Sequence, residues 1–211
     1  MTTCQSHLKY HLPEAARVDW GLERWWKHIN AQVYHFYPGR IVGRVIDVGC
    51  GVGAMSLLVA QDPAVSYVLG LDVSYEAIAA AERFRERLGE SKVEFQIADF
   101  TIPTTLPAES FDSAMSFHTL EHIYPEDLDQ FMANLNAVLK PGATVLISIP
   151  HLRNYYDPGH KSFFDVASLR TLFVTHGFTP EEVYSTYEGR RVTSNYDGKI
   201  LTGLFHKGGI K

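Results

Sequence analysis

The most chemically suggestive stretch of the sequence is a glycine-rich segment that follows a short apolar run. Residues 47–53 read Asp-Val-Gly-Cys-Gly-Val-Gly, and glycine allows backbone angles and a close ligand approach that other residues do not. A second carboxylate, Asp72, ends the next apolar run, about 20 residues after the loop, where it can accept both hydroxyl groups of a ribose. The spacing therefore predicts a nucleoside-binding loop.

The first carboxylate helps to choose between two classes of nucleoside cofactor. Gly49, Gly51 and Ala54 also fit the nicotinamide fingerprint, which accepts alanine at its third position. Asp47, however, stands two residues before the first glycine, where it would repel an anionic pyrophosphate. It would instead attract a cationic sulfonium cofactor that carries an amino group. The sequence favours the sulfonium cofactor, and a nicotinamide oxidoreductase is kept as an alternative.

Histidines form a second group of candidates, because imidazole is the natural proton acceptor near neutral pH. His118 and His151 follow two predicted strands and are the candidate catalytic bases. His118, Glu121 and His122 also have the spacing i, i+3, i+4, which places them on one face of a helical turn. With His160 they offer imidazoles and a carboxylate suited to a divalent metal. The leading prediction assigns no metal ligand, and an enzyme that uses a divalent metal at these four residues is an alternative.

Further polar residues could hold a substrate. The segment from His151 to Lys161 is rich in cationic and phenolic side chains that could clamp a carboxylate or a phosphate. Aromatic residues near the N-terminus could add walls to the same pocket. The predicted substrate-binding residues are Tyr10, Trp26, Arg153, Tyr156, His160 and Lys161.

Alternating strand and helix patterns must position these residues. Short apolar runs predict strands at 45–48, 67–73, 93–97, 111–117 and 144–150. Helical spacing predicts helices at 54–60, 78–88, 128–139 and 166–173. We expect Ser74 to cap the second of these helices, and Lys140-Pro141-Gly142 to end the third. Residues 183–187 and 200–206 are expected to form a terminal hairpin. The alternation predicts an α/β fold with a doubly wound, mostly parallel sheet and helices on both faces.

The chain is expected to fold as one domain behind a helical segment. Apolar residues recur at helical spacing near the N-terminus: Leu22, Trp25, Trp26, Ile29, Val33 and Phe36. Such a stripe must be buried, either against the main domain or as a lid over a site. We predict a helical lid segment at 1–39 and the cofactor-binding domain at 40–211.

Composition excludes several classes of protein. The chain has 211 residues and a net charge of −5, which argues against a nucleic-acid partner. It has no apolar run long enough for a membrane span and no signal peptide. Its cysteines, Cys4 and Cys50, are too few for a disulfide framework and fit a reducing compartment. A cytoplasmic protein without nucleic-acid or membrane partners, either monomer or homodimer, is expected.

A series of motifs resembles those of the class I S-adenosylmethionine-dependent methyltransferases, of the type that acts on small molecules. The motifs are Val45-Ile-Asp-Val-Gly-Cys-Gly-Val-Gly53, Leu71-Asp-Val-Ser74, Ala98-Asp-Phe100, Phe111-Asp112, Leu120-Glu-His-Ile123 and Leu139-Lys-Pro-Gly142. They cover about residues 40–180 in the order typical of this family. The resemblance implies a Rossmann-like sheet of seven strands with an antiparallel last strand. It also implies S-adenosyl-L-methionine as cofactor, S-adenosyl-L-homocysteine as product and a small-molecule methyl acceptor.

The resemblance also implies roles for individual residues. The glycines bring the backbone close to the methionine part and the ribose, Asp47 holds the amino-acid end, and Asp72 binds the ribose hydroxyls. Val73 and Asp99 are expected at the adenine. The implied cofactor-binding residues are Asp47, Gly49, Cys50, Gly51, Gly53, Asp72, Val73, Asp99, Phe100, Phe117 and His118. We therefore expect transfer of a methyl group to an oxygen or a nitrogen of a small molecule, anionic ones included, by in-line displacement with a histidine base. One alternative is a metal-assisted O-methyltransferase that uses His118, Glu121, His122 and His160. A non-enzymatic S-adenosylmethionine-binding protein is a further alternative.

Overall fold

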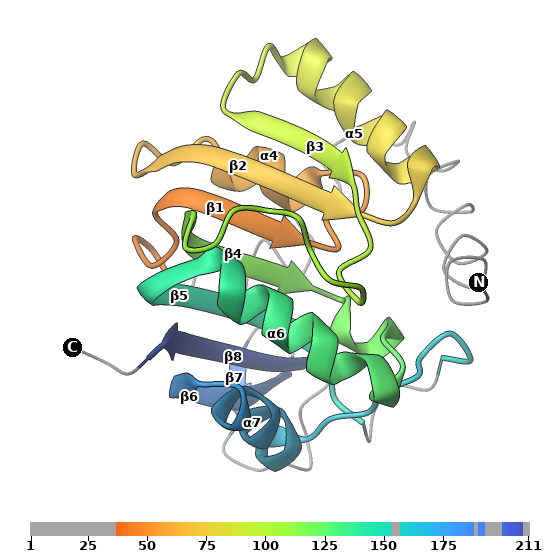
Figure 1. Ribbon diagram of the computed structural model, residues 1–211, viewed down its shortest axis with the longest axis vertical. Coiled ribbons are helices and arrows are strands. Elements are labelled where there is room, and N and C mark those ends of the chain that lie inside the picture. The colour runs from red at the N-terminus through yellow and green to blue at the C-terminus, as the bar shows by residue number, and fades with distance from the viewer. Residues whose placement is uncertain (1–36, 153–156, 188–189, 193–199, 209–211) are drawn as a thin grey trace.

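The fold is built on one mixed β-sheet, seen in a computed structural model that describes residues 37–152, 157–187, 190–192 and 200–208 (Figure 1). Within these ranges the strand order is β3-β2-β1-β4-β5-β8-β6-β7. The strands are β1 (Gly43–Val48), β2 (Val65–Asp72), β3 (Val93–Ile97), β4 (Phe111–Phe117), β5 (Leu139–Pro150), β6 (Phe178–Tyr187), β7 (Arg190–Val192) and β8 (Ile200–Lys207).

The directions of the strands confirm the predicted sheet. β1 pairs in parallel with β2 and with β4, and the β2–β3 and β4–β5 pairs are also parallel. β8 lies antiparallel between β5 and β6, as expected for the last strand of seven. The predicted terminal hairpin is therefore the pair β6–β8. A three-residue strand, β7, pairs with β6 at the edge and was not predicted.

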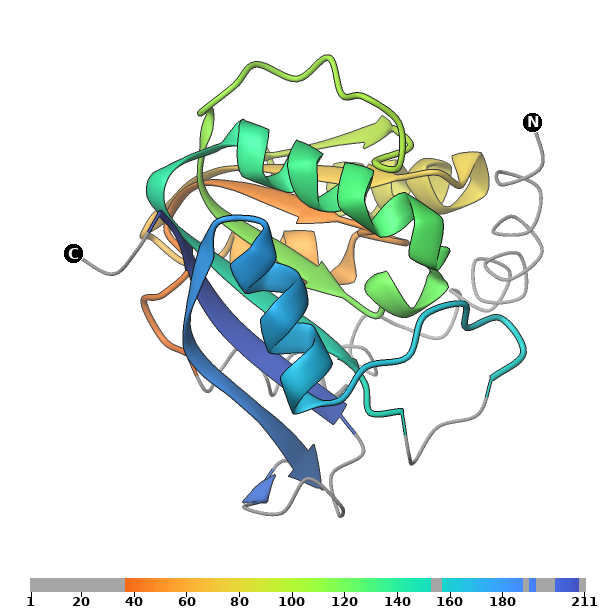
Figure 2. The same ribbon diagram turned by 60° about the horizontal axis from the view of Figure 1, so that its bottom comes forward.

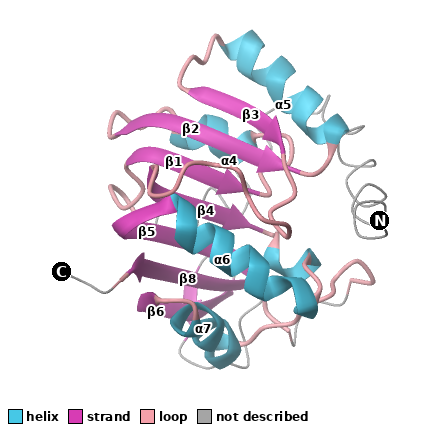
Figure 3. Ribbon diagram, in the orientation of Figure 1, coloured by secondary structure: helices cyan, strands magenta, loops and turns pink. Residues whose placement is uncertain are grey.

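Helices cover both faces of the sheet, as the alternation predicted (Figures 1, 2 and 3). The helices are α4 (Ala54–Val59), α5 (Tyr75–Leu88), α6 (Leu128–Val138) and α7 (Val166–Thr175), with short 3₁₀ turns η2 (Leu120–His122) and η3 (Pro125–Asp127). α6 and α7 pack apolar side chains into one buried cluster, whereas α4 and α5 contribute to the other. None of these helices has the length and hydropathy that a membrane span requires.

The order in which the chain adds strands to the sheet changes direction at the β1–β4 pair. From β1 the chain adds β2 and β3 on one side, and then crosses to β4 and β5 on the other side. The carboxyl ends of β1 and β4 therefore lie next to each other, at Val48 and Phe117. Such a switch point is where doubly wound sheets bind ligands, and it brings the glycine loop beside His118.

Local signals explain most element boundaries, with one difference. Ser74 caps α5 as expected, since its hydroxyl accepts a hydrogen bond from the Ala77 amide, and Gly89 ends the helix in a left-handed conformation. Lys140-Pro141-Gly142 follow the end of α6 as expected, but β5 begins at Leu139 rather than at the predicted residue 144, so the three residues lie within the strand. Gly142 has a φ of +79°, and the β4–β5 register shifts between Phe111 and Ser113. The three residues thus form an irregular start to the strand.

Residues 1–36 lie outside the described ranges, and so the expected helical lid at 1–39 stays a prediction. The described chain begins at Tyr37, whose side chain is buried in the cluster beneath α4. The Tyr37 hydroxyl lies within hydrogen-bond distance of Tyr184 and Glu182 on β6. These contacts attach the segment before β1 to β6.

Candidate functional site

The loop after β1 uses its three glycines for different purposes. Gly49, Gly51 and Gly53 all have positive φ, at +78°, +54° and +79°. A Cβ on Gly49 would lie 2.1 Å from the hydroxyl of Thr119, and a Cβ on Gly53 would lie 2.4 Å from the ring of Phe95. A Cβ on Gly51 would meet nothing within 4 Å. Gly49 and Gly53 are thus required by packing, whereas Gly51 leaves open space through which a ligand can approach the backbone.

Asp47 is a buried carboxylate at the carboxyl end of β1. It is 2% exposed, and Ser56 on α4 donates a hydrogen bond to its Oδ2 at 2.6 Å. Burial raises the pKa of Asp47 to about 7, with the charge of Asp72 adding to the rise and the Ser56 hydrogen bond opposing it. A cationic ligand beside this side chain would stabilise its ionised form. The site therefore favours a positively charged group near Asp47.

Cys50 is a packing residue in this loop. Its sulfur would lie 3.0 Å from a Cβ on Gly70, and so it fills the space that a glycine leaves on β2. Burial raises the pKa of the Cys50 thiol well above its ordinary value, and the charges of Asp72 and Asp47 add to the effect. Since only the thiolate is a strong nucleophile, this rise disfavours a nucleophilic role for Cys50.

Asp72 closes the loop from the end of β2. The Gly51 amide donates to its Oδ2 and the Ser74 amide donates to its Oδ1, both at 2.9 Å. Each oxygen keeps a second lone pair, so the carboxylate can still accept hydroxyl donors. Asp99, after β3, is held in a similar way by the amide and hydroxyl of Thr101, at 2.9 and 2.6 Å. The two carboxylates are therefore set in place before any ligand arrives.

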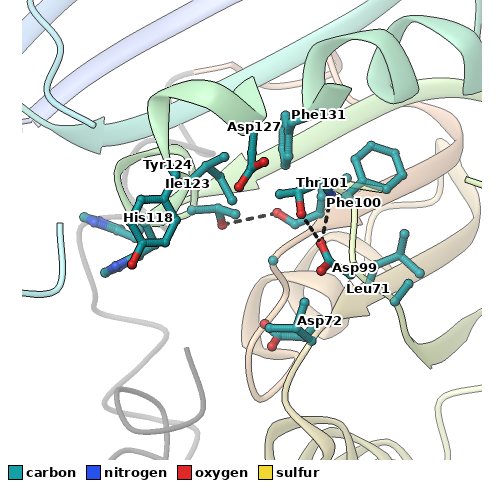
Figure 4. Close-up of a pocket in the computed structure, with 16 residues that line it drawn as sticks. Leu71, Asp72, Asp99, Phe100, Thr101, His118, Ile123, Tyr124, Asp127 and Phe131 are labelled. Atoms are coloured by element: carbon teal, nitrogen blue, oxygen red, sulfur yellow. Dashed lines mark hydrogen bonds between the residues drawn. The ribbon is translucent and has the colours of Figure 1, made fainter. Parts of the chain in front are cut away.

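A pocket of about 710 Å³, including its open mouth, lies at the switch point. Figure 4 shows Asp72 and Asp99 on one side of the pocket and His118 on the opposite side. The lining residues are Val48, Gly49, Leu71, Asp72, Val73, Ala98, Asp99, Phe100, Thr101, His118, Thr119, His122, Ile123, Tyr124, Asp127 and Phe131. Acidic groups thus face an imidazole across an otherwise largely apolar space.

His118 has an unusual backbone conformation directly after β4. Its φ is +54°, a left-handed value that is rare for a residue other than glycine. Its amide donates to the Ser148 carbonyl of β5 at 2.8 Å, which holds the chain in this bend. The side-chain Nδ1 lies 3.2 Å from Oε1 of Glu121, a carboxylate that is itself buried. The bend therefore places an imidazole on the pocket wall with an acidic side chain next to it.

The segment after β5 lies beside η2. The amides of Lys161 and Ser162 donate to the Glu121 carbonyl at 2.7 and 3.1 Å. The rings of His122 and His160 meet edge to face, with 5.0 Å between their centroids. Lys161 extends over the ring of Tyr124, with its Nζ 5.5 Å from the ring centroid. This segment thus adds an imidazole and an ammonium group near the pocket.

The structure brings six of the predicted site residues together on the pocket wall: Gly49, Asp72, Val73, Asp99, Phe100 and His118. Phe100 also packs edge to face on Phe131, with ring centroids 5.5 Å apart. Asp47, Cys50, Gly51 and Gly53 lie in or beside the same loop without lining this pocket. Phe117 is buried in the cluster on the α4 side of the sheet.

The other predicted residues divide into three groups. His151 is 1% exposed and forms an isolated bridge to Phe164, away from the pocket lining. His160 and Lys161 lie beside the pocket wall through their contacts with His122 and Tyr124. The remaining four, Tyr10, Trp26, Arg153 and Tyr156, lie outside the described residues, so their roles stay predictions.

Sequence reasoning missed several residues that support the site. Thr119 packs against Gly49, and its hydroxyl lies 3.3 Å from the Val48 carbonyl. Ser56 and Thr101 hold the carboxylates of Asp47 and Asp99. A signal existed for Thr101, since an aspartate commonly bonds the backbone two residues ahead. No local pattern pointed to Ser56, because the fold alone brings it to Asp47.

Comparisons with known proteins agree with this geometry. A family described as a methyltransferase domain matches residues 46–147. A probable S-adenosylmethionine-dependent methyltransferase of Mycolicibacterium smegmatis is 30% identical over 191 residues, covering 85% of this chain and 70% of that protein. The ajmaline N-methyltransferase of Rauvolfia serpentina is 31% identical, covering 59% of this chain and 42% of that protein. The chain thus spans less than half of this second relative.

A solved structure shows the same fold. An S-adenosylmethionine-dependent methyltransferase from Aquifex aeolicus superposes with a TM-score of 0.71 at 18% identity, covering 92% of this chain and 97% of the other. Together with the relative from M. smegmatis, it bears out the resemblance that the sequence motifs gave. The chain belongs to the S-adenosylmethionine-dependent methyltransferases and uses S-adenosylmethionine as its cofactor.

Proposed function

We propose that the protein transfers the methyl group of S-adenosylmethionine to an oxygen or nitrogen atom of a small molecule, including anionic ones. The observation that carries the proposal is the pocket at the switch point, where Asp72 and Asp99 face His118 (Figure 4). One side of this pocket offers acceptors for the hydroxyl and amino groups of a nucleoside. The other side offers a group that can receive a proton.

The residues present fit the cofactor. The open space at Gly51 allows the backbone to approach a ligand, and buried Asp47 favours a cationic group nearby. Asp72, Asp99 and Val73 line the pocket, and we assign Asp72 to the ribose hydroxyls and Asp99 with Val73 to the adenine. When bound, the cofactor supplies a methyl group on a positively charged sulfur that leaves as a neutral thioether. The chain itself contributes orientation and exclusion of water.

His118 is the proposed base. An acceptor hydroxyl must lose its proton as the new bond to carbon forms, and an ammonium must lose a proton before its nitrogen can attack. An imidazole on the pocket wall can take either proton. The buried Glu121 carboxylate, 3.2 Å from Nδ1 of His118, would orient the ring. His151, the other predicted base, does not line the pocket. His118 is therefore favoured over His151 for this role.

An anionic acceptor has a candidate partner in Lys161. Its ammonium lies over Tyr124, which lines the pocket, and near the Pro158 carbonyl at 3.4 Å. A carboxylate or phosphate entering beside Tyr124 would gain a charge-assisted hydrogen bond. The related ajmaline N-methyltransferase is named for a small molecule. This likeness supports a small molecule as the methyl acceptor of this chain.

The proposal is tested by binding and transfer assays on the full chain. We expect S-adenosylhomocysteine to bind stoichiometrically in calorimetry, and radiolabelled methyl groups to appear in products formed from pools of small metabolites. His118→Asn should lower kcat by about 10²–10⁴-fold, the usual contribution of a general base. Its affinity for S-adenosylhomocysteine should fall far less than kcat, because Asp72 and Asp99 on the opposite side of the pocket remain in place. Asparagine is chosen because it tolerates the left-handed backbone at this position.

A control variant, His206→Gln, removes an imidazole that pairs with Glu181 on the far part of the sheet and should retain full activity. Full activity in His118→Asn would contradict the assignment of the base. Failure of the wild-type chain to bind either form of the cofactor, or to label any small molecule, would refute the proposed function.

A further inference from the structure

We propose that Glu121, His122 and His160 bind a divalent transition-metal ion, with zinc the best fit, at the acceptor side of the pocket. One atom from each of the three side chains lies within 4.8 Å of the others. Two of the ligands are neighbours on η2 and the third comes from the segment after β5.

Glu121 is a buried acid that lacks a hydrogen-bonded partner for its charge. The residue is 2% exposed, and within the described residues neither carboxylate oxygen accepts a hydrogen bond. Oε1 lies 3.2 Å from His118 Nδ1, at ion-pair distance but outside hydrogen-bond geometry. Buried charges in proteins are paired or coordinate metals, because desolvation of a bare charge is costly. A cation at this place would supply the missing compensation.

The backbone holds the third ligand close to the first two. The amides of Lys161 and Ser162 both donate to the carbonyl of Glu121, so the segment that carries His160 is attached directly to η2. A tetrahedral zinc ion with bonds of 2.0–2.2 Å needs ligand atoms about 3.3 Å apart. Side-chain rotations that close the group by roughly 1.5 Å are therefore sufficient.

The orientation of His122 also suits a ligand. Its Nδ1 lies 3.4 Å from the carbonyl oxygen of Gly159. A neutral ring that donates to this carbonyl carries its proton on Nδ1 and its lone pair on Nε2. Histidines that ligate metals are commonly oriented by such a contact to a backbone carbonyl. Gly159 would thus act as the outer partner of the site.

The donor set selects among metals. Two imidazole nitrogens and one carboxylate favour zinc and its neighbours in the first transition row over magnesium or calcium, which prefer oxygen ligands. Three protein ligands leave a coordination position open, as in catalytic zinc sites. His122 and His118 both line the pocket, so this position lies on the acceptor side.

A metal ion at this place would limit which molecules can serve as the methyl acceptor. This inference rests on the proposed function. An amine has one lone pair, which bonding to the metal would occupy, whereas a hydroxyl oxygen keeps another with which to attack carbon. Metal ions also lower the pKa of a bound hydroxyl group. The site therefore fits an acceptor that is methylated on oxygen.

The test measures metal binding directly, on the full chain without substrate. Chelator-treated protein is titrated with Zn²⁺ and Mg²⁺ by calorimetry, and with Co²⁺ by visible absorption, which reports coordination by nitrogen and oxygen ligands. We expect one equivalent of Zn²⁺ or Co²⁺ per chain and much weaker binding of Mg²⁺. His160→Gln and Glu121→Gln should each weaken Zn²⁺ binding by at least tenfold, while the control His206→Gln binds as the wild type does.

Each outcome decides the proposal. Absence of stoichiometric Zn²⁺ or Co²⁺ uptake by the wild type overturns it, as does unchanged affinity in His160→Gln. His160 lies on a loop, so this variant remains informative even if Glu121→Gln, altered at a buried position, does not fold. S-adenosylhomocysteine binding is measured on the same samples. Failure of metal binding with intact cofactor binding overturns the metal site alone, whereas the reverse result overturns the proposed function.

Discussion

The two walls of the pocket are built by different means. On the wall formed by the β1 loop, the end of β2 and the segment after β3, backbone amides and hydroxyls hold the carboxylates of Asp72 and Asp99. On the wall formed by η2 and the segment after β5, imidazoles surround Glu121, whose carboxylate accepts no hydrogen bond in the described chain. We refer to these as the cofactor wall and the acceptor wall.

This difference determines how each wall responds when neighbouring side chains change. Groups held by the backbone keep their places when neighbouring side chains change, because the fold itself supplies the hydrogen bonds. Groups held by other side chains change with each substitution. The cofactor wall can therefore stay the same in proteins with very different acceptors, whereas substitutions on the acceptor wall can change which acceptor fits.

The largest expected effect is on the cofactor wall at Asp72. Asp72→Ala removes the acceptor of the Gly51 and Ser74 amides and the proposed partner of the ribose. Since hydrogen bonds to a charged group contribute about 1.5–3 kcal/mol each, the Kd for S-adenosylhomocysteine should rise by at least about 100-fold. Calorimetry measures this. An unchanged Kd would show that this carboxylate does not define the cofactor wall.

Two glycine substitutions separate packing from ligand approach within the same loop. Gly49→Ala should lower the free energy of unfolding by about 3 kcal/mol, because its Cβ would lie 2.1 Å from Thr119 and its φ is positive. Gly51→Ala meets open space and should cost only about 1–2 kcal/mol of backbone strain. It should nevertheless weaken S-adenosylhomocysteine binding by roughly tenfold. Denaturant unfolding and calorimetry measure the two quantities, and the reverse ranking of stabilities would contradict the loop geometry.

Protonation of Asp47 on the cofactor wall should make both the stability of the chain and its affinity for the cofactor depend on pH. Its pKa is about 7 in the fold against 3.8 ordinarily, so between these values the folded chain binds a proton that the unfolded chain has lost. This contribution to stability is fully present below pH 4 and is lost as the pH rises through 7. The cationic end of the cofactor prefers ionised Asp47. Its affinity should therefore rise by up to about tenfold from pH 6 to pH 8.

Asp47→Asn provides the control for this titration. It should flatten both the pH dependence of unfolding in the cofactor-free chain and the pH dependence of cofactor binding. Thermal unfolding and calorimetry across the pH range give the two profiles. A profile in Asp47→Asn as steep as that of the wild type would assign the titration to another group.

The smallest effect is expected outside both walls. Lys140 pairs with Asp112 at 2.6 Å, and both side chains are substantially exposed. Lys140→Ala should cost less than about 1 kcal/mol of stability, as is usual for surface ion pairs, and should leave the Kd for S-adenosylhomocysteine unchanged. Denaturant unfolding at low and high salt checks this. A loss of cofactor affinity would mean that the walls are less independent of the sheet than proposed.

The cofactor wall was largely predictable from the sequence. Glycine after an apolar run and an aspartate at the end of the next strand are local patterns with a physical meaning, and Asp72 lies where they indicated. The strand and helix pattern likewise predicted the mostly parallel sheet with helices on both faces. Lys140-Pro141-Gly142 marked the end of α6, but the next strand begins at Leu139 rather than at residue 144, because a register shift accommodates an irregular start of β5.

The acceptor wall was only partly predictable. The spacing of His118, Glu121 and His122 suggested that they would gather, but nothing local indicated that Glu121 would be buried or that His118 would adopt a left-handed backbone. Both follow from contacts with β5 and the segment after it, which are distant in sequence. Such contacts are set by tertiary packing, which neither propensity nor periodicity encodes.

The segment between β5 and α7 is tied down at two places. The Leu152 amide donates to the Phe164 carbonyl at 3.0 Å, and the Lys161 amide donates to the Glu121 carbonyl at 2.7 Å. The chain between these ties begins and ends at fixed points, so its length can vary without disturbing either anchor. Doubling a loop costs only about 0.6 kcal/mol of closure entropy. Insertions there offer an engineer a route to new acceptors on an unaltered catalytic scaffold.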